Sequence, residues 1–254
     1  MSAFVAGRNP VIEALSRRSE HIDKVFVQRD LKSSVLRRIA SDADRSGIPV
    51  QFVPRQKLDQ LVADTPHQGV VAAVTAIGYV DLDDMLNSVA AGLDETRRLQ
   101  PSLIVLDGIQ DPHNLGAILR TAAAGGVNGV VLPVAKTAPL NAVVVKASAG
   151  TAGMIPIARV RKLVDAVTQL KERGFWIVGM SAAGTDTVWS LDWKRPVALV
   201  VGSEGGGMSR MVSEACDHHV RIPMEDSVES LNVSVATGIA LFVARHLRVA
   251  DAAG

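Results

Sequence analysis

The spacing of apolar and polar residues in the first 78 positions alternates between the periods of strands and of helices. Apolar alternation predicts strands, and amphipathic periodicity predicts helices. The predicted strands are 23–28, 48–53 and 69–77, and the predicted helices are 9–18, 31–47 and 55–62. Asn9 followed by Pro10 predicts an N-cap and then a first helical residue. This order of elements predicts a small α/β domain.

The remainder of the chain continues the alternation, with longer apolar runs. The predicted strands are 102–107, 129–133, 175–180, 196–202 and 220–223, and the predicted helices are 114–126, 139–147, 161–173, 209–216 and 231–248. Strands that are apolar throughout, rather than at every second position, predict a sheet covered on both faces. The expected fold class is therefore α/β with a mostly parallel sheet, and ligands bind such sheets at the carboxyl ends of the strands.

Composition narrows the class of protein. The chain has 254 residues, of which 48% are hydrophobic and 21% are charged, and this excludes a wholly disordered protein. The single cysteine, Cys216, excludes a disulfide framework, fits a reducing compartment and is expected to be a buried, inert thiol. No apolar run approaches the roughly 20 residues of a membrane span, and the first residues lack the plan of a signal peptide. We therefore expect a cytoplasmic protein with no membrane contact.

Charge is distributed unevenly and indicates where domains begin. Residues 1–78 carry 11 Lys and Arg against 8 Asp and Glu, whereas residues 79–100 carry 2 against 5. The acidic segment lacks strong strand patterns and ends before a proline. We therefore predict a basic N-terminal domain over 1–78, a linker over 79–100 with one short helix, and a larger domain over 101–254. The tail over 248–254 is expected to be disordered.

Three polar segments, two of which contain glycine, follow the strands predicted at 102–107, 196–202 and 220–223. Because these ends meet at one edge of a parallel sheet, we expect the segments to form one site. Glycines in the second segment, GSEGGGMS, allow a ligand to approach the backbone closely. The polar side chains that these segments contribute are Asn114, Arg120, Glu204, Ser230 and Asn232.

Each of these side chains also has a purely structural interpretation. Asn114 and Asn232 could cap helices, Glu204 could cap the following helix, and Arg120 could be a surface arginine. Their joint placement favours a site, in which we expect Arg120 to lie near the loop rather than in solvent.

Common nucleotide and metal signatures are absent from the sequence. The segment 202–207 has the glycine spacing of a phosphate-binding loop, but Met208 stands where such a loop needs lysine, and Glu204 would repel phosphate. No glycine-rich dinucleotide fingerprint follows the first strand of either domain. No pair of cysteines or histidines has the spacing of metal ligands, so no metal is expected.

Three motifs resemble a known family. NLGAILR (114–120), LVVGSEGGGMS (199–209) and IPMEDSVESLNVSVATGIALF (222–242) resemble the signature motifs of the SpoU (TrmH-type) RNA ribose 2′-O-methyltransferases. GRNPVIEAL (7–15) and HQGVVAAV (67–74) resemble the substrate-binding domain of the RlmB-like branch, the 23S rRNA guanosine-2′-O-methyltransferases.

The resemblance implies a SPOUT fold, in which about residues 197–246 form a deep trefoil knot, an exception to the rule that chains are unknotted. It also implies a homodimer through the knotted domain and S-adenosylmethionine as the cofactor. The residues that match the cofactor-binding positions are Gly202, Ile222 and Leu231, followed by Val201, Met180, Ser181 and Met224.

The resemblance further implies a set of catalytic and RNA-binding residues. Arg120 matches the position at the ribose, where we expect it to bind a phosphate or the developing oxyanion, since guanidinium is not deprotonated in proteins. Asn114 and Glu204 would hold Arg120 and the loops, while Asn232 and Ser230 would orient the target nucleotide or the cofactor edge. The basic residues of the N-terminal domain that would bind RNA phosphates are Arg8, Arg17, Arg18, Arg29, Lys32, Arg37 and Arg38.

Three other functions stay open at this point. The first is 2′-O-methylation of a different rRNA nucleotide or of tRNA. The second is a catalytically silent RNA-binding assembly factor on the same scaffold. The third is a generic nucleotide-binding α/β enzyme.

Overall fold

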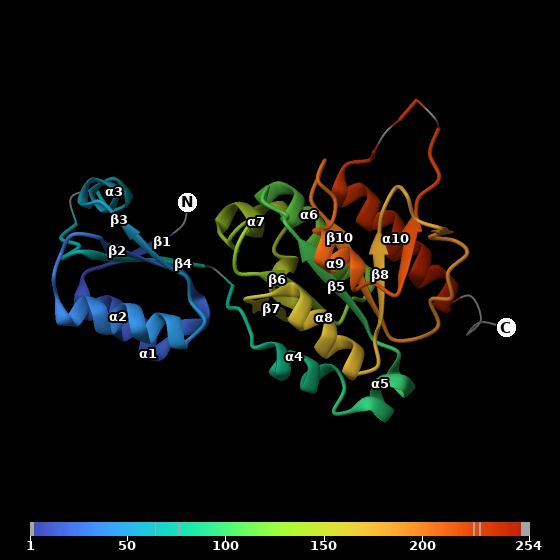
Figure 1. Cartoon of the computed structure of the whole chain (residues 1–254), viewed down its shortest axis with the longest axis horizontal. Coiled ribbons are helices and arrows are strands. Elements are labelled where there is room, and N and C mark those ends of the chain that lie inside the picture. The colour runs from blue at the N-terminus through green and yellow to red at the C-terminus, as the bar shows by residue number, and fades with distance from the viewer. Residues whose placement is uncertain (1–2, 64, 76, 226, 229, 250–254) are drawn as a thin grey trace. The chain divides into compact units, whose positions relative to one another are not determined.

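The structure, a computed structural model, describes residues 3–63, 65–75, 77–225, 227–228 and 230–249. It divides into two compact units (Figure 1). Unit 1 comprises Met1–Tyr79 and Pro139–Val143, and unit 2 comprises Val80–Ala138 and Val144–Gly254.

Unit 1 is a small α/β unit, as its periodicity predicts. The strands of its sheet, in spatial order, are β1 (Ala3–Ala6), β4 (Val70–Val74), β2 (Ile22–Gln28) and β3 (Val50–Val53). β4 is antiparallel to β1 and β2, and β2 is parallel to β3. The helices are α1 (Arg8–Arg17), α2 (Ser34–Arg45) and α3 (Arg55–Leu61), with a 3-10 turn at Ser19–His21. Figure 1 shows α1 and α2 on one face of the sheet and α3 on the other.

The two faces of this sheet have separate cores because strand side chains alternate between faces. On one face, Val11 of α1 and Leu36 of α2 pack with Val25 of β2. On the other, Leu58 of α3 packs with Val71 of β4. The prediction that Asn9 caps α1 is wrong, because the helix begins at Arg8 with Gly7 as its N-cap.

Unit 2 contains a parallel sheet with helices on both faces, again as predicted. Its strands, in spatial order, are β7 (Ile157–Val160), β6 (Gly129–Pro133), β5 (Ser102–Asp107), β10 (Val197–Gly202), β8 (Trp176–Met180), β11 (His218–Arg221) and β9 (Asp186–Thr187). Every pairing in this order is parallel. The sequence pattern did not indicate β1, β7 or β9, which have two to four residues each.

The helices of unit 2 form two layers (Figure 1). α6 (Pro112–Gly125) and α10 (Val233–Val249) pack together on one face of the sheet. The second layer comprises α4 (Leu82–Val89), α8 (Leu163–Glu172) and α9 (Arg210–Glu214), whose apolar side chains share one core with the sheet. The remaining helices are α5 (Leu93–Leu99), α7 (Ala142–Ala147) and the 3-10 turn at Thr151–Met154.

The segment predicted as a linker with one short helix instead forms two helices, α4 and α5, and α4 belongs to the core of unit 2. Met85 and Leu86 of α4 are buried in that core. The acidic residues have a local explanation. The Asp81 side chain accepts a hydrogen bond from the N–H of Asp83 at the start of α4, and α5 has acidic residues in its first turn. Carboxylates at helix N-termini stabilise the helix dipole, so the acidic composition marks helix starts.

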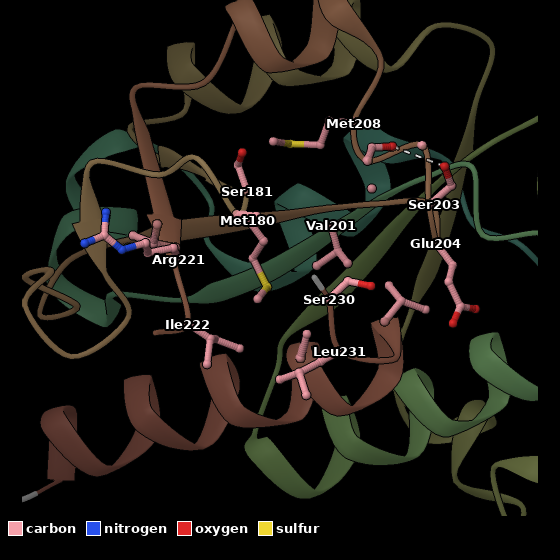
Figure 2. A pocket seen from close by; sticks show the side chains of 18 of the residues that line it. Met180, Ser181, Val201, Ser203, Glu204, Met208, Arg221, Ile222, Ser230 and Leu231 are labelled. Carbon is pink, nitrogen blue, oxygen red and sulfur yellow. Dashed lines mark hydrogen bonds between the residues drawn. The ribbon is translucent and has the colours of Figure 1, made fainter. Parts of the chain in front are cut away.

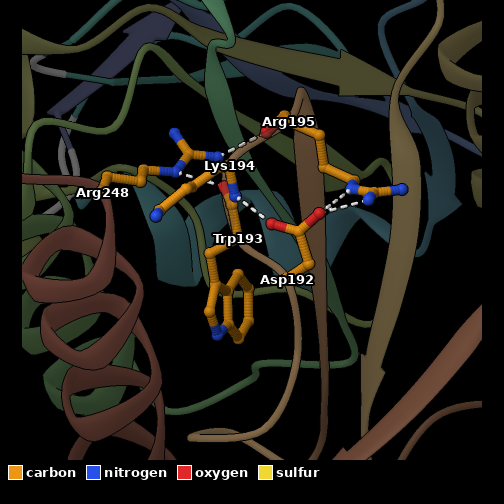
Figure 3. A network of polar contacts seen from close by, with 5 residues as sticks. All are labelled: Asp192, Trp193, Lys194, Arg195 and Arg248. Carbon is orange, nitrogen blue, oxygen red and sulfur yellow. Dashed lines mark hydrogen bonds and ion pairs between the residues drawn. The ribbon is translucent and has the colours of Figure 1, made fainter. Parts of the chain in front are cut away.

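The end of α10 is anchored by Arg248, which is in the helix rather than in a disordered tail (Figure 3). Its guanidinium donates to the carbonyl oxygens of Trp193 and Arg195, each over 2.7 Å. It also donates to the Gln100 carbonyl over 2.9 Å and to the Ser102 hydroxyl. Burial lowers the pKa of this guanidinium from its ordinary value. Residues 250–254, the rest of the predicted tail, lie outside the described residues.

Candidate cofactor pocket and its polar rim

The carboxyl ends of β8, β10 and β11 open into a pocket of about 520 Å³. Figure 2 shows Met180, Val201, Ile222 and Leu231 around the same space. All seven residues predicted to bind the cofactor line this pocket, and they are Met180, Ser181, Val201, Gly202, Ile222, Met224 and Leu231. Met180 and Leu231, which are 51 positions apart in the chain, therefore meet at the predicted sheet edge.

A tight turn after β10 forms one wall of the pocket. The backbone N–H of Ser203 donates to the Gly207 carbonyl, and the N–H of Gly207 donates to the Ser203 carbonyl, each over 2.9 Å. A Cβ on Gly202 would lie 2.0 Å from the carbonyl carbon of Gly207 and 2.1 Å from the nitrogen of Met208. Only glycine therefore fits at position 202 while the turn folds back over the strand end.

The pocket is also lined by side chains that were not among the predicted cofactor-binding residues. Met208, Ser213 and Arg221 line it. The Arg221 guanidinium donates to the Gly184 carbonyl over 2.8 Å, and the Ser213 hydroxyl lies 3.0 Å from Nε2 of His219. Met208 lies within the second motif, but no periodicity or spacing in the sequence indicates that α9 and β11 bring Ser213 and Arg221 to this pocket.

A chain of side-chain hydrogen bonds runs along the rim. Oδ1 of Asn232 accepts the backbone N–H of Ser234 over 2.9 Å at the start of α10, so its amide nitrogen must face the other way. That nitrogen donates to Oδ1 of Asn114 over 3.0 Å, and Nδ2 of Asn114 donates to Oε2 of Glu204 over 3.1 Å. The backbone N–H of Ser234 thus determines the orientation of the Asn232 amide, which in turn determines the orientation of the Asn114 amide.

Two structural interpretations of these residues can now be decided. Asn114 is not the N-cap of α6, because Asp111 occupies that position and accepts the N–H of His113 over 3.0 Å. Asn232 does bond the first turn of α10, in addition to its bond with Asn114. Asn232 therefore both bonds the first turn of α10 and takes part in the hydrogen-bond chain along the pocket rim.

Arg120 lies apart from the other predicted site residues within this chain. It is on α6, six residues beyond Asn114, and does not line the pocket. Its side chain is exposed, so the prediction that it lies near the loop rather than in solvent is wrong. Within the described ranges, its guanidinium has no hydrogen bond or ion pair. Ser230, by contrast, lines the pocket beside Leu231.

The basic residues predicted to bind RNA are on the outside of unit 1. Arg17, Arg18, Arg29, Lys32, Arg37 and Arg38 are exposed, and Arg8 is half-buried. Arg17 pairs with Glu13 over 3.1 Å, and Arg38 pairs with Asp42 over 3.7 Å. Exposed pairs of this kind contribute little to stability, so these cations can exchange partners at small cost.

Two general properties complete the description. Among the residues that the structure describes, no three His, Cys, Asp or Glu side chains gather as potential metal ligands. None of the described helices has both the length and the apolar content of a transmembrane span.

Comparison with known protein families assigns the parallel α/β unit, with its glycine turn and pocket, to a family of RNA methylases. The model of the SpoU rRNA Methylase family matches residues 101–242, more than half of the chain, and the chain belongs to that family. A second model, RNA 2'-O ribose methyltransferase substrate binding, matches residues 4–80. The family predicted from the motifs is thus confirmed, together with the α/β fold.

Individual relatives cover almost the whole chain. A relative from Bacillus subtilis (strain 168), named as a TrmH family tRNA/rRNA methyltransferase, is 41% identical over 239 residues, which is 94% of this chain and 93% of the relative. The crystal structure of an AdoMet-bound rRNA methyltransferase from Sinorhizobium meliloti is 28% identical, with a TM-score of 0.60 over 96% of this chain and 87% of that chain. The TrmH/SpoU tRNA modifying enzyme of A. aeolicus is 30% identical, with a TM-score of 0.56 over 67% and 84%.

Proposed function

We propose that this protein transfers the methyl group of S-adenosylmethionine to a ribose 2′-hydroxyl in RNA. Its substrate in this proposal is a guanosine in the peptidyl-transferase region of 23S rRNA. The observation that carries the proposal is the convergence of all seven predicted cofactor residues on one pocket. The match of unit 1 to the substrate-binding model supports RNA as the partner.

The pocket fits this cofactor by size and by charge. A volume of about 520 Å³ falls within the usual range for small-molecule sites. Glu204 lines the pocket, and its carboxylate on the rim attracts a sulfonium cation and disfavours a triphosphate. When bound, S-adenosylmethionine supplies an electrophilic methyl group on a good leaving group, so the protein need only orient the acceptor and manage its proton.

The rim residues have distinct roles in this proposal. The chain from Asn232 through Asn114 holds the Glu204 carboxylate in one orientation, which preorganises the pocket entrance. Ser230 and Asn232 orient the target nucleotide. Arg120 offers an exposed guanidinium to a phosphate or to the developing oxyanion, and because it stays protonated it does not act as the base. Holding the hydroxyl in line with the methyl group supplies much of the rate.

The proposal includes a trefoil knot over about residues 197–246, a homodimer through unit 2 and a cytoplasmic location. The gathering of residues 201–208 with Ile222, Met224, Ser230 and Leu231 around one pocket supports the knot. Exposed Val235, Phe242 and Val249 recur at seven-residue intervals on α10, where a second copy would cover them.

A tRNA substrate is the second candidate. The relative from Bacillus subtilis is named for both tRNA and rRNA, and the A. aeolicus neighbour is a tRNA modifying enzyme. A silent RNA-binding factor is disfavoured, because Asn114, Arg120 and Glu204 are all present.

The test is transfer of labelled methyl from S-adenosylmethionine to unmodified 23S rRNA and, in parallel, to tRNA, followed by mapping of ribose methylation. One 2′-O-methylguanosine in 23S rRNA that is absent with Arg120→Ala supports the proposal in full. Transfer to tRNA alone keeps the chemistry and replaces the substrate. Cofactor binding without transfer to either RNA overturns the catalytic assignment.

A further inference from the structure

Two motifs of unit 1 that are sixty residues apart in sequence meet at a second cavity. Arg8, from GRNPVIEAL, donates from Nε to the Gln68 carbonyl over 3.2 Å, and its backbone N–H donates to Oε1 of Gln68 over 3.3 Å. Gln68 belongs to HQGVVAAV. The cavity beside them measures about 930 Å³. Its polar lining consists mainly of Arg8, Gln28, Arg55, Asp59, His67 and Gln68.

A buried histidine organises one wall of this cavity. The His67 side chain is 8% exposed. Its Nδ1 lies 3.0 Å from the backbone nitrogen of Gly69, which can only donate, so Nδ1 is the acceptor. The proton is therefore on Nε2, which donates to Oδ1 of Asp59 over 2.9 Å. The second oxygen of Asp59 lies 3.8 Å from Nε of Arg55, so the carboxylate is held between the histidine and the cation.

The backbone next to this histidine adopts a conformation that costs free energy. Gln68 has φ of 50°, the left-handed region that residues other than glycine rarely adopt, and Gly69 follows with φ of 86°. A Cβ at Gly69 would lie 2.7 Å from Cδ2 of Leu31. Both hydrogen bonds from Arg8 hold Gln68 in this conformation, and strained backbone of this kind is enriched at ligand sites.

We propose that this cavity binds one unpaired nucleotide of the RNA substrate. The guanidiniums of Arg8 and Arg55 supply fork-shaped donors for a phosphate. The amides of Gln28 and Gln68 can both donate to and accept from a base edge, which an RNA duplex does not expose in its narrow major groove. Leu31, Val62 and Pro66 supply apolar surface for the face of the base. The inference rests on the proposed RNA function. It makes this cavity the place where unit 1 distinguishes an unpaired nucleotide from paired RNA.

The test uses the full-length protein and two fluorescein-labelled RNAs. One is a hairpin pool with a randomised unpaired loop, and the other is the same stem closed as a blunt duplex. The variants are Arg55→Ala, which removes an exposed cation, and Gln68→Gly, which removes the amide side chain while suiting the left-handed backbone. Arg45→Ala is the matched control, since it also breaks an exposed ion pair on a helix of unit 1 but does not line the cavity.

We expect Arg55→Ala and Gln68→Gly each to weaken hairpin binding about tenfold and duplex binding much less, with Arg45→Ala within about twofold of wild type. Equal losses for Arg55→Ala and Arg45→Ala, or equal losses on hairpin and duplex, would overturn the proposal. Methyl transfer to 23S rRNA and tRNA is measured alongside. If the variants lose hairpin binding selectively but the wild-type protein transfers no methyl group, the cavity assignment holds and the proposed function is wrong. If the wild-type protein transfers methyl groups but the variants bind the hairpin normally, the proposed function holds and the cavity assignment is wrong.

Discussion

The side-chain amide of Asn114 donates to a carboxylate oxygen of Glu204 over 3.1 Å, although ninety residues separate them in the chain. Asn114 is in the first turn of α6, and Glu204 is in the turn after β10. Because Asn232 fixes the opposite end of the Asn114 amide, Glu204 receives a donor rather than an acceptor. The bond therefore joins the first and second family motifs through one oriented amide, and the third motif sets its direction.

Asn114→Asp replaces this donor by an acceptor and places two carboxylates next to each other. We expect kcat/KM for methyl transfer to fall about 10- to 100-fold, the range for losing one hydrogen bond to a charged group. Asn87→Asp is the control, because Asn87 is exposed on α4 and its oxygen accepts from Arg173, a role that aspartate keeps. Labelled methyl transfer measures both. Equal activity of Asn114→Asp and wild type would mean that the Glu204 orientation has no role in the reaction.

Gly202→Ala tests whether the turn after β10 shapes the cofactor pocket. The new Cβ would lie 2.0 Å from the backbone of Gly207, so the turn must move away from the strand end. We expect the affinity for S-adenosylmethionine, measured by calorimetry, to fall at least about tenfold. Gly153→Ala is the control, since a Cβ there meets nothing within 4 Å. Unchanged affinity in Gly202→Ala would place the cofactor elsewhere.

The place of the pocket could be predicted from the sequence because polar segments follow strands that the apolar runs identify, whereas the seven cofactor residues were predicted from the resemblance to the family motifs. Val201 lies near the end of β10 and Ile222 just after β11, and these two parallel strands flank β8, so topology brings their carboxyl ends to one edge of the sheet. The role of the 79–100 segment could not be predicted in this way. Its acidic residues are typical of a linker, whereas Met85 and Leu86 are buried only because β6 and α8 supply a surface for them.

The shortest strands and the direction of the Arg120 side chain could not be predicted from the hydrophobic pattern either. β9 has two residues, too few for any periodicity, and exists because β11 offers an edge. The motif places Arg120 on the helix after Asn114, and that part of the prediction is correct. Which way the guanidinium points depends on the helix rotation that packing against α10 sets, and this information is absent from local sequence.

Cys216 is predicted to be unreactive at neutral pH. Burial, with a smaller contribution from Asp217, raises the pKa of its thiol to about 11. Alkylation by iodoacetamide should stay slow below about pH 10 and rise through the folded-state pKa. Because the folded pKa is raised, the associated stability is fully present below the unfolded pKa and is lost as the pH rises toward 11. Cys216 is half-buried in the structure, so rapid alkylation of the folded protein at pH 8 would contradict the raised pKa.

Arg248→Ala tests how the end of α10 is fixed to unit 2. The substitution leaves the carbonyls of Trp193, Arg195 and Gln100 without this donor, and charged hydrogen bonds of this kind are costly to lose. We expect the free energy of unfolding to fall by about 2–4 kcal/mol. Arg248→Lys should recover only part of this loss, because one ammonium cannot reproduce the planar fork.

Tryptophan fluorescence in urea measures this change in unit 2 specifically, since the three tryptophans of the chain, Trp176, Trp189 and Trp193, all belong to it. Arg245→Ala is the control on the same helix, because its exposed side chain makes one longer bond, 3.3 Å, to the Gly125 carbonyl. Arg245→Ala should lower the free energy of unfolding by less than about 0.5 kcal/mol. Equal costs for Arg248→Ala and Arg245→Ala would show that the buried guanidinium does not anchor the helix, and that apolar packing of α10 against α6 alone keeps it in place.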